Sequence, residues 1–494
     1  MIVAAFRRFV AAGAFIALSA CATVPAVDTN ALERAAIEQN LRRDIEILAS
    51  DDFGGRKPGT DGEAKTLAFI QGELQKAGLV SGTNDPASEW RAPVELVSIE
   101  PYSSSITIRT GKRTIKVNNA EATAITSRRR ELVDGAKVVF VGNLGEEAPA
   151  EMVSGSIVVM LGEPGESPAR RAALFAKNPV AVVTVVEDQL AITRQNRFYR
   201  RERVQLASET DTSLSAYVTK GAMEDAFGEE NWTRYVALAG RPDFQPKILE
   251  ATMAIEASAN RREFASNNLL GKLPGTDPDA GAILLLGHWD HLGECGPLDA
   301  EDRICNGAVD NASGIASMLE LIRRLAATGP FDRDIYVLAT TAEENGLLGA
   351  RAFIEAPSIP LDNIVAAFNF DTVAIAPEGS SVGFVGEGRS ALDPIIREVM
   401  QAMGRTQGDK ALAERFERRQ DGWALLQEGV PSVLISTSFG SEEVLGPFLE
   451  TDYHRAGDEV EAIVLGGAID DLLLHEALVR RFANISTYPT PPSQ

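Results

Sequence analysis

Imidazole and carboxylate side chains gather in the stretch 282–314 of this 494-residue chain. The chain has four histidines, and two of them, His288 and His291, stand here with Asp290 between them. Asp310 follows after an acidic loop. Imidazole nitrogens and carboxylate oxygens are donors that bind divalent cations such as zinc. The stretch therefore predicts half of a metal site.

The elements around these residues explain how they could be positioned. The apolar run Ile283–Leu286 precedes His288 and is typical of a strand buried on both faces, so we predict a strand over Ala282–His288. After Asp310 the apolar residues recur with helical spacing. Ligands in open α/β sheets bind at the carboxyl ends of the strands, which is where His288 and its neighbours are expected.

The same arrangement recurs downstream, where acidic or imidazole groups follow predicted strands. The predicted strands are Asp334–Thr340, Ile364–Phe370 and Ser432–Ser436, and the groups are Glu343-Glu344, Asp371 and, in a loop after the last strand, Tyr453-His454. Upstream we predict helices over 30–50 and 62–77 and strands over 94–99, 105–110, 113–117, 251–257 and 268–273. This alternation predicts an α/β fold with a mixed, mostly parallel sheet flanked by helices.

Residues 119–248 differ from the rest of the chain in their pattern of apolar and polar residues. Short β-rich runs alternate with basic and polar stretches, and none of these residues is histidine or cysteine. We interpret the region as an inserted β-rich module that shapes access or docks partners. The alternative is that these residues are further loops of one large domain.

Five spaced elements together resemble the zinc-binding set of the two-zinc aminopeptidase family, which includes secreted bacterial leucyl aminopeptidases, aminopeptidase Y and the glutamate carboxypeptidases. The elements are His288-Trp289-Asp290-His291, Asp310-Asn311-Ala312-Ser313-Gly314, Glu343-Glu344, Asp371 and Tyr453-His454. The turn Gly55-Arg56-Lys57-Pro58-Gly59-Thr60 resembles the N-terminal part of the family, and 119–248 more weakly resembles its protease-associated insert. The resemblance implies a zinc exopeptidase fold.

The resemblance also implies the roles of individual residues. Asp310 would bridge two Zn²⁺ ions, for which Co²⁺ or Mn²⁺ could substitute. His288 and Asp371 would complete one site, and Glu344 and His454 the other. A cis peptide bond between Asp310 and Asn311 is expected as well.

Three further residues are predicted to assist catalysis. Asp290 would orient the His288 imidazole, Glu343 would act as general base and then acid, and Tyr453 would donate a hydrogen bond to the oxyanion. His291 is predicted to be structural and His475 a surface or packing residue. The triplet Arg419-Gln420-Asp421 approximates a family segment near the substrate cleft but departs from its usual Ser-Asp pair.

The N-terminus reads as a targeting segment. Arg7 and Arg8 precede a short apolar run and Leu18-Ser19-Ala20-Cys21, which resembles a bacterial lipobox with Cys21 as the lipidation site. The alternative is an ordinary signal peptide with a chance cysteine. Because residue 22 is alanine rather than aspartate, the pattern indicates the periplasmic face of the outer membrane, and the mature chain is expected there or secreted.

The oxidising environment outside the cytoplasm favours a disulfide between Cys295 and Cys305, with a thiolate metal site as the alternative.

The predicted organisation is a signal peptide at 1–21, a linker at 22–30, an N-terminal part of the peptidase domain at 31–118, the insert at 119–248, the metal-binding part at 249–487 and a tail at 488–494.

Composition limits the partners. The net charge of −22 argues against nucleic acid and anionic membrane surfaces as binding partners, whereas it suits divalent cations and amine-bearing substrates such as peptides. The leading hypothesis is an aminopeptidase. The alternatives are a carboxypeptidase acting on acidic dipeptides, a single-zinc glutaminyl cyclase, and a non-catalytic binding module on the same scaffold.

Overall fold

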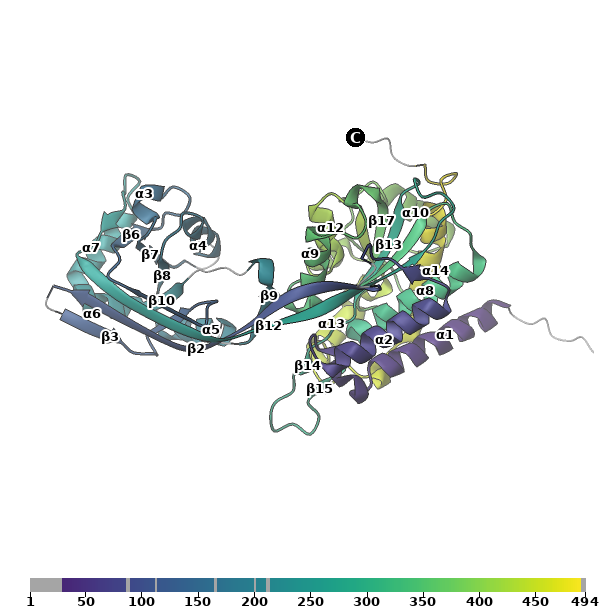
Figure 1. Cartoon of the computed structure of the whole chain (residues 1–494), viewed down its shortest axis with the longest axis horizontal. Helices are drawn as coiled ribbons and strands as arrows, with labels where there is room; N and C mark the ends of the chain where they lie inside the picture. The colour runs from purple at the N-terminus through teal and green to yellow at the C-terminus, as the bar shows by residue number, and fades with distance from the viewer. Residues whose placement is uncertain are drawn as a thin grey trace, which may run out of the picture.

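Two modules joined by a pair of long strands make up the molecule (Figure 1). The computed structural model describes residues 29–85, 89–111, 113–163, 167–199, 201–209 and 214–489. We call the larger body, with the helices α1, α2, α8 and α14, the main module, and residues 122–248 the insert module. The predicted lipidation site Cys21 lies outside the described residues, with the rest of 1–28. No helix in the described part of the chain is long and apolar enough to span a bilayer.

The main module is built on a mixed sheet with the strand order β18-β19-β17-β13-β16-β12-β2-β3. These strands are β18 (Gly383–Val385), β19 (Ser432–Ser436), β17 (Ile364–Asn369), β13 (Ala282–His288), β16 (Asp334–Thr340), β12 (Ala251–Leu273), β2 (Arg91–Thr110) and β3 (Arg113–Val117). β13, β16, β17 and β19 are parallel to their neighbours within this group. The predicted mixed, mostly parallel sheet is confirmed at this centre.

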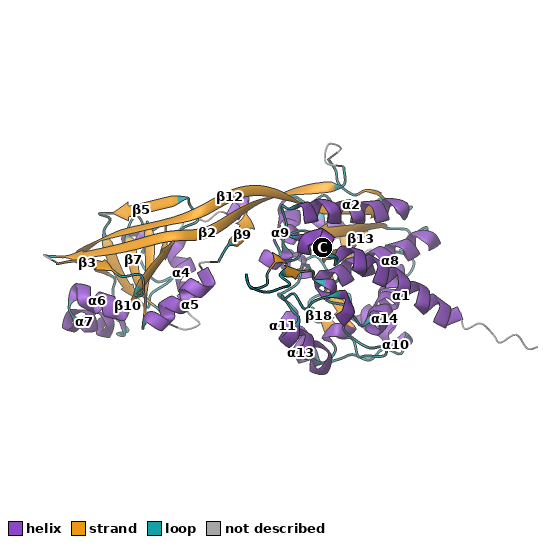
Figure 2. Cartoon of the chain, turned by 90° about the horizontal axis from the view of Figure 1, so that it is seen from below, coloured by secondary structure: helices purple, strands orange, loops and turns teal. Residues whose placement is uncertain are grey.

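Helices cover both faces of the sheet (Figures 1 and 2). The helices of the main module are α1 (Thr29–Leu48), α2 (Asp61–Lys76), α8 (Gly314–Thr328), α9 (Leu348–Glu355), α10 (Asp393–Ala402), α11 (Lys410–Phe416), α12 (Gly422–Gln427), α13 (Glu442–Thr451) and α14 (Leu465–Phe482). On β13, Ile283 and Leu285 belong to the cluster that includes α1, α2, α8 and α14, whereas Leu284 and Leu286 belong to the opposite cluster with Leu425 of α12. This alternation is why the strand is apolar at every position.

The two long strands β2 and β12 correct the predicted boundaries. Two short strands were expected in each, yet both run on without interruption and pair antiparallel along almost their whole length, with one register shift at Ser258/Ala259. They extend from the main module into the insert module (Figure 2). Between the modules they expose polar side chains such as Ser103 and Ser258, whose hydroxyls hydrogen-bond at 2.7 Å. Few side chains of that stretch are buried, Ala259 among them, so burial imposes little apolar pattern there.

The insert module has its own sheet and its own core. Its sheet has the order β11-β6-β7-β8-β10-β4. The strands are β11 (Lys247–Ile248), β6 (Val138–Gly142), β7 (Ile157–Leu161), β8 (Ala181–Val186), β10 (Ser215–Thr219) and β4 (Ala122–Ile125), and the helices are α3 (Ala150–Val153), α4 (Ser167–Phe175), α5 (Gln189–Tyr199), α6 (Lys220–Phe227) and α7 (Glu229–Ala239). The predicted β-rich insert is therefore an α/β module with parallel strands β6, β7, β8 and β10.

Three short strands tie further segments to the main sheet. They are β1 (Val80–Ser81), β5 (Arg130–Asp134) and β9 (Arg203–Leu206). β9 pairs with β2, and Leu206 packs in one buried cluster with Ala342 and Leu348 of the main module. The insert module thus reaches the turn that carries Glu343.

Candidate metal centre

The predicted metal-binding side chains meet at the carboxyl edge of the main sheet. β13 runs parallel to both β16 and β17, so these three strand ends lie side by side. His288 is the last residue of β13. Glu343 begins a 3₁₀ turn after β16, and Asp371 lies two residues beyond β17. Asp310 lies in the irregular turn before α8, and His454 follows α13.

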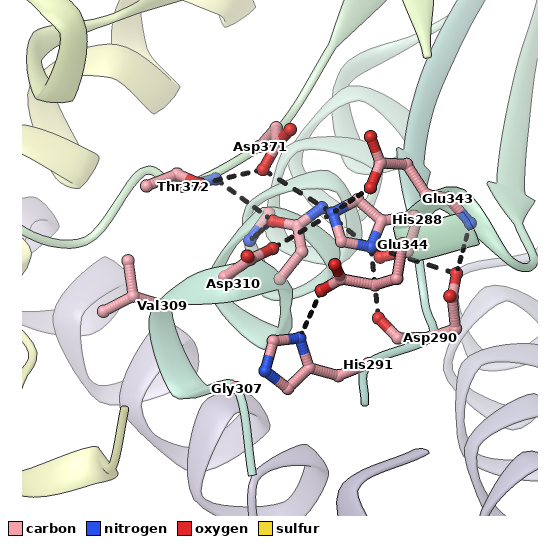
Figure 3. A network of polar contacts seen from close by, with 12 residues as sticks. His288, Asp290, His291, Gly307, Val309, Asp310, Glu343, Glu344, Asp371 and Thr372 are labelled. Atoms are coloured by element: carbon pink, nitrogen blue, oxygen red, sulfur yellow. Dashed lines mark hydrogen bonds and ion pairs between the residues drawn. The ribbon is translucent and has the colours of Figure 1, made fainter. Parts of the chain in front are cut away.

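One cluster forms around His288 (Figure 3). Its Nε2 lies 3.2 Å from Oδ1 of Asp310 and 3.6 Å from Oδ1 of Asp371. All three residues are buried, with at most 7% of their surface exposed. One imidazole nitrogen and two carboxylate oxygens therefore converge on a small, buried space, with the donor set and the spacing that suit a divalent cation.

A second cluster forms around Glu344 and shares Asp310 with the first. Nε2 of His454 lies 2.9 Å from Oε2 of Glu344 and 3.4 Å from Oδ2 of Asp310. Asp310 thus presents Oδ1 to His288 and Oδ2 to His454. A carboxylate that divides its oxygens between two groups of donors has the geometry needed to bridge two cations.

His291 lies in the second cluster as well, although it was predicted to be structural. Its Nδ1 lies 2.6 Å from Oε1 of Glu344, and its ring centroid lies 6.0 Å from that of His454. The two atoms are close but are not aligned for a hydrogen bond, so both Nδ1 and Oε1 remain buried without such a partner. Unpaired buried donors of this kind fit a bound cation. The sequence did carry a signal for this placement, because His291 lies three residues after His288, beyond the end of the same strand.

The charge distribution also fits bound cations. Burial lowers the pKa of His288, but Glu343, Asp310 and Asp371 outweigh it and raise that pKa well above the ordinary value of an imidazole. Burial likewise opposes the shift at Asp310, whose pKa is held well below its usual range by hydrogen bonds from His288 and His454. The centre therefore carries an excess of negative charge that attracts positive charge, and its mixed imidazole and carboxylate donors favour zinc.

Glu343 lies beside the first cluster without joining it. Its Oε2 is 4.0 Å from Nε2 of His288. Burial raises the pKa of Glu343 well above its ordinary value, and Asp421 and Asp371 add to the shift against the opposing charge of His288. A carboxyl group next to the metal-binding donors is positioned to accept and release a proton.

The contacts of Asp290 differ from the predicted ones. Nδ1 of His288 lies 3.1 Å from the backbone carbonyl of Asp290, while the Asp290 carboxylate is 3.9 Å away. Oδ1 of that carboxylate instead accepts a hydrogen bond of 3.1 Å from the backbone N–H of Glu343. The imidazole is therefore oriented by the main chain, and the Asp290 side chain holds the turn that presents Glu343.

Sequence reasoning missed one residue that supports Asp310. Asp458 is fully buried and accepts hydrogen bonds from the backbone N–H groups of Val309, at 2.8 Å, and of Asp310, at 3.0 Å. Asn311 donates to the carbonyl of Phe370 at 2.8 Å and follows Asp310 through a cis peptide bond, as expected. Asp458 comes 148 residues after Asp310, so no local pattern pointed to it.

Arg56 lies beneath the centre. Its guanidinium donates to four backbone carbonyls, those of Leu48, Trp289, Asn306 and Gly307, at 2.5–2.9 Å. Trp289 follows His288, and Gly307 precedes the Asp310 turn, so one buried side chain joins the two segments that carry these donors.

A pocket with one apolar wall and one polar wall opens beside the two clusters. Its lining includes Asp310, Glu343, Asp371, Thr372, Phe416, Arg419, Gln420, Leu434, Phe439, Leu445, Leu449 and Tyr453. The Tyr453 ring stacks on His454, with centroids 3.8 Å apart. Its hydroxyl accepts a hydrogen bond of 3.1 Å from Arg419 and keeps its own proton available to the pocket.

The two remaining cysteines lie beside the second cluster. Cys295 and Cys305 form a disulfide across the short hairpin β14 (Gly293–Glu294) and β15 (Ile304–Cys305). Sγ of Cys295 lies 3.6 Å from the carbonyl oxygen of His454. The hairpin therefore contacts the segment that presents this histidine.

Fold and site together define an α/β metalloprotein with two donor clusters that share one aspartate at the carboxyl edge of its sheet. Residues 268–471, about two fifths of the chain, match Peptidase family M28. The predicted resemblance is confirmed.

Similar proteins agree with this assignment. "Probable lipoprotein aminopeptidase LpqL" of Mycobacterium tuberculosis is 25% identical over 243 residues, which are 44% of this chain and 46% of that protein. Aminopeptidase YwaD of Bacillus subtilis is 32% identical over 220 residues, 43% of each chain. The chain thus spans less than half the length of these relatives. The structure of an aminopeptidase from Aneurinibacillus sp. strain AM-1 shares the fold, with a TM-score of 0.54 and 17% identity, covering 94% of this chain and 97% of that one.

Proposed function

We propose that this chain is a zinc-dependent aminopeptidase that binds two zinc ions and removes the N-terminal residue of peptides. The observation that carries the proposal is the division of Asp310, which turns one oxygen to His288 and the other to His454. His288 and Asp371 would hold one ion, and Glu344 and His454 the other. Two clusters argue against a single-zinc cyclase, and the complete donor set argues against a non-catalytic module.

The chain's own residues account for the proton transfers. Bound zinc would act as a Lewis acid and supply a nucleophilic water at neutral pH. Glu343 would accept the proton of that water at Oε2 and pass it to the amine that leaves when the peptide bond breaks. The Tyr453 hydroxyl would donate to the carbonyl oxygen as negative charge develops there. The Asp290 carboxylate keeps Glu343 in place by accepting a hydrogen bond from the backbone N–H of Glu343.

The pocket supports a preference for the first residue of the peptide. Its wall includes Phe416, Leu434, Phe439, Leu445 and Leu449. Burial of an apolar side chain against such a wall contributes about 1.5–3 kcal/mol. We therefore propose that peptides with a large apolar N-terminal residue are the preferred substrates, while the surrounding carboxylates attract the protonated amine.

The cellular setting is also a proposal. The lipobox-like segment ending at Cys21 supports a lipid anchor, with the mature chain on the periplasmic face of the outer membrane. The insert module, for which a protease-associated character was predicted, would then extend from the anchored peptidase domain. Its core includes residues of β2, β3 and β12, so the module packs on the far ends of these strands.

The test compares hydrolysis of leucine 4-nitroanilide with that of its N-acetyl derivative and measures zinc by mass spectrometry. The free amine should be strongly preferred, with two zinc ions per chain. Glu343→Gln should keep both ions and lower kcat about 10²- to 10⁴-fold. Glu320→Gln, on α8 and outside the centre, is the matched control. Near-normal turnover by Glu343→Gln, or equal turnover of the blocked substrate, would overturn the proposal.

A further inference from the structure

Arg419 differs in charge from every other side chain around the pocket. Among the described lining residues it is the one cation, and the others are carboxylates, apolar groups, a threonine, a glutamine and Tyr453. It lies in the short connection between α11 and α12. The pocket therefore has a positive group on one wall and the carboxylates of the metal centre on another.

Contacts with the wall hold the Arg419 guanidinium in place. Its central carbon lies 5.1 Å from the ring centroid of Phe416 and 5.7 Å from that of Tyr453. One Nη2–H donates to the Tyr453 hydroxyl at 3.1 Å. Stacking between two rings restricts the guanidinium plane, so binding a ligand would cost little additional side-chain freedom.

No carboxylate in the described part of the chain neutralises this cation. The chain has 70 acidic and 48 basic residues, and two other arginines of the main module are paired with carboxylates: Arg415 lies 2.9 Å from Glu442, and Arg389 lies 2.8 Å from Glu417. Arg419 lies within 4 Å of no carboxylate oxygen among the described residues, and it is exposed. Four of its five N–H donors remain free to bind a molecule in the pocket.

We propose that Arg419 binds a carboxylate of the substrate and so determines specificity. Arginine presents a planar pair of donors that matches a carboxylate. The carboxylate is either the free C-terminus of a dipeptide or an acidic side chain just after the scissile bond. A peptide bound this way places its amine near the acidic centre and its carboxylate on Arg419. The inference rests on the proposed aminopeptidase function.

The experiment compares kcat/KM for Leu-Ala, Leu-Ala amide and Leu-Asp amide. The ratio of the preferred carboxylate substrate, Leu-Ala or Leu-Asp amide, to Leu-Ala amide should be about 10 to 100, mainly through KM, as expected for a charge-assisted pair. In Arg419→Gln the ratio should fall to about one, and Arg419→Lys should recover part of it. Arg418→Gln is the matched control, because Arg418 stacks on Trp423 and does not line the pocket.

The ratio isolates this role from any effect on Tyr453, because a displaced tyrosine would slow both substrates equally. A high kcat/KM for Leu-Ala identifies the C-terminal carboxylate as the source, and a high kcat/KM for Leu-Asp amide identifies the side-chain carboxylate; either result supports the proposal. A ratio near one in the native chain, or an unchanged ratio in Arg419→Gln, overturns it. Leucine 4-nitroanilide carries no carboxylate. Activity on it with a ratio near one overturns the Arg419 proposal alone, and inactivity on every substrate overturns both.

Discussion

Replacement of Arg56 by methionine should destabilise the main module strongly. The side chain is 1% exposed, and its guanidinium is the partner of four backbone carbonyls. Burial is the largest influence on Arg56 and lowers its pKa to about 10, while nearby carboxylates, Asp458 and Asp310 foremost, oppose that shift. The cation therefore compensates both the carbonyl dipoles and the acidic centre above them.

The magnitude follows from these contacts. Methionine fills similar volume but leaves four buried acceptors without this donor, at about 1 kcal/mol each. The resulting loss of about 4 kcal/mol lies in the range of about 3–5 kcal/mol that follows when one partner of a buried ionic contact is removed. With a denaturant slope of about 3 kcal/mol per M, the urea midpoint of Arg56→Met should fall by about 1–1.5 M.

The assay is urea unfolding followed by tryptophan fluorescence, with zinc and with a chelator. The shift should be larger without metal, because the carboxylates then lose both sources of positive charge. Arg42→Met is the matched control: Arg42 is exposed on α1 and 3.9 Å from Glu38, so its loss should cost at most about 1 kcal/mol. A midpoint within about 0.3 M of the native value, or a smaller shift in the chelated chain, would refute the reasoning.

Three further outcomes test the centre and its surroundings. Asp310→Ala should lose both zinc ions on dialysis and His454→Ala chiefly one, as measured by mass spectrometry; two ions retained by Asp310→Ala would refute the bridge. The double replacement of Cys295 and Cys305 by serine should weaken zinc retention, because Cys295 contacts the carbonyl of His454; equal retention would exclude this support. Burial lowers the pKa of His475 to about 4, below about 6.5 in the unfolded chain, so between these values the unfolded chain binds a proton that the folded one does not. The free energy of unfolding should thus fall by about 3 kcal/mol from pH 6.5 to 4, and His475→Gln should remove this component of the slope in urea titrations.

The centre of the sheet was predictable because its strands are buried on both faces. Ala282–His288, Asp334–Thr340 and Ser432–Ser436 begin and end as predicted. A strand covered on both sides must be apolar at nearly every position, and its apolar run stops where the site begins. The metal-binding side chains that follow such runs could therefore be assigned to the carboxyl edge of the sheet from the sequence.

The connection between the modules was not predictable in this way. β2 and β12 cross from one module to the other with exposed polar side chains, such as Ser103 and Ser258, facing solvent. Backbone pairing between the two strands holds them there, and backbone hydrogen bonds impose little pattern on side chains. The helices and the parallel strands of the insert module were not predicted either, because the short apolar runs of that region are typical of β-rich structure.

The sequence by itself determined which side chains follow each buried strand, among them His288, Glu343, Glu344 and Asp371, because periodicity and order along the chain are local properties. It also placed Asp310 directly before a helix. Only the tertiary structure decided which distant groups complete the site. Arg56 binds the carbonyl of Asn306 across 250 residues, and Arg419 stacks on Tyr453 across 34. The tertiary structure also places Nδ1 of His291 2.6 Å from Oε1 of Glu344, in the second cluster. Such contacts depend on how helices and loops close over the sheet, and that closure leaves no periodic trace in the chain.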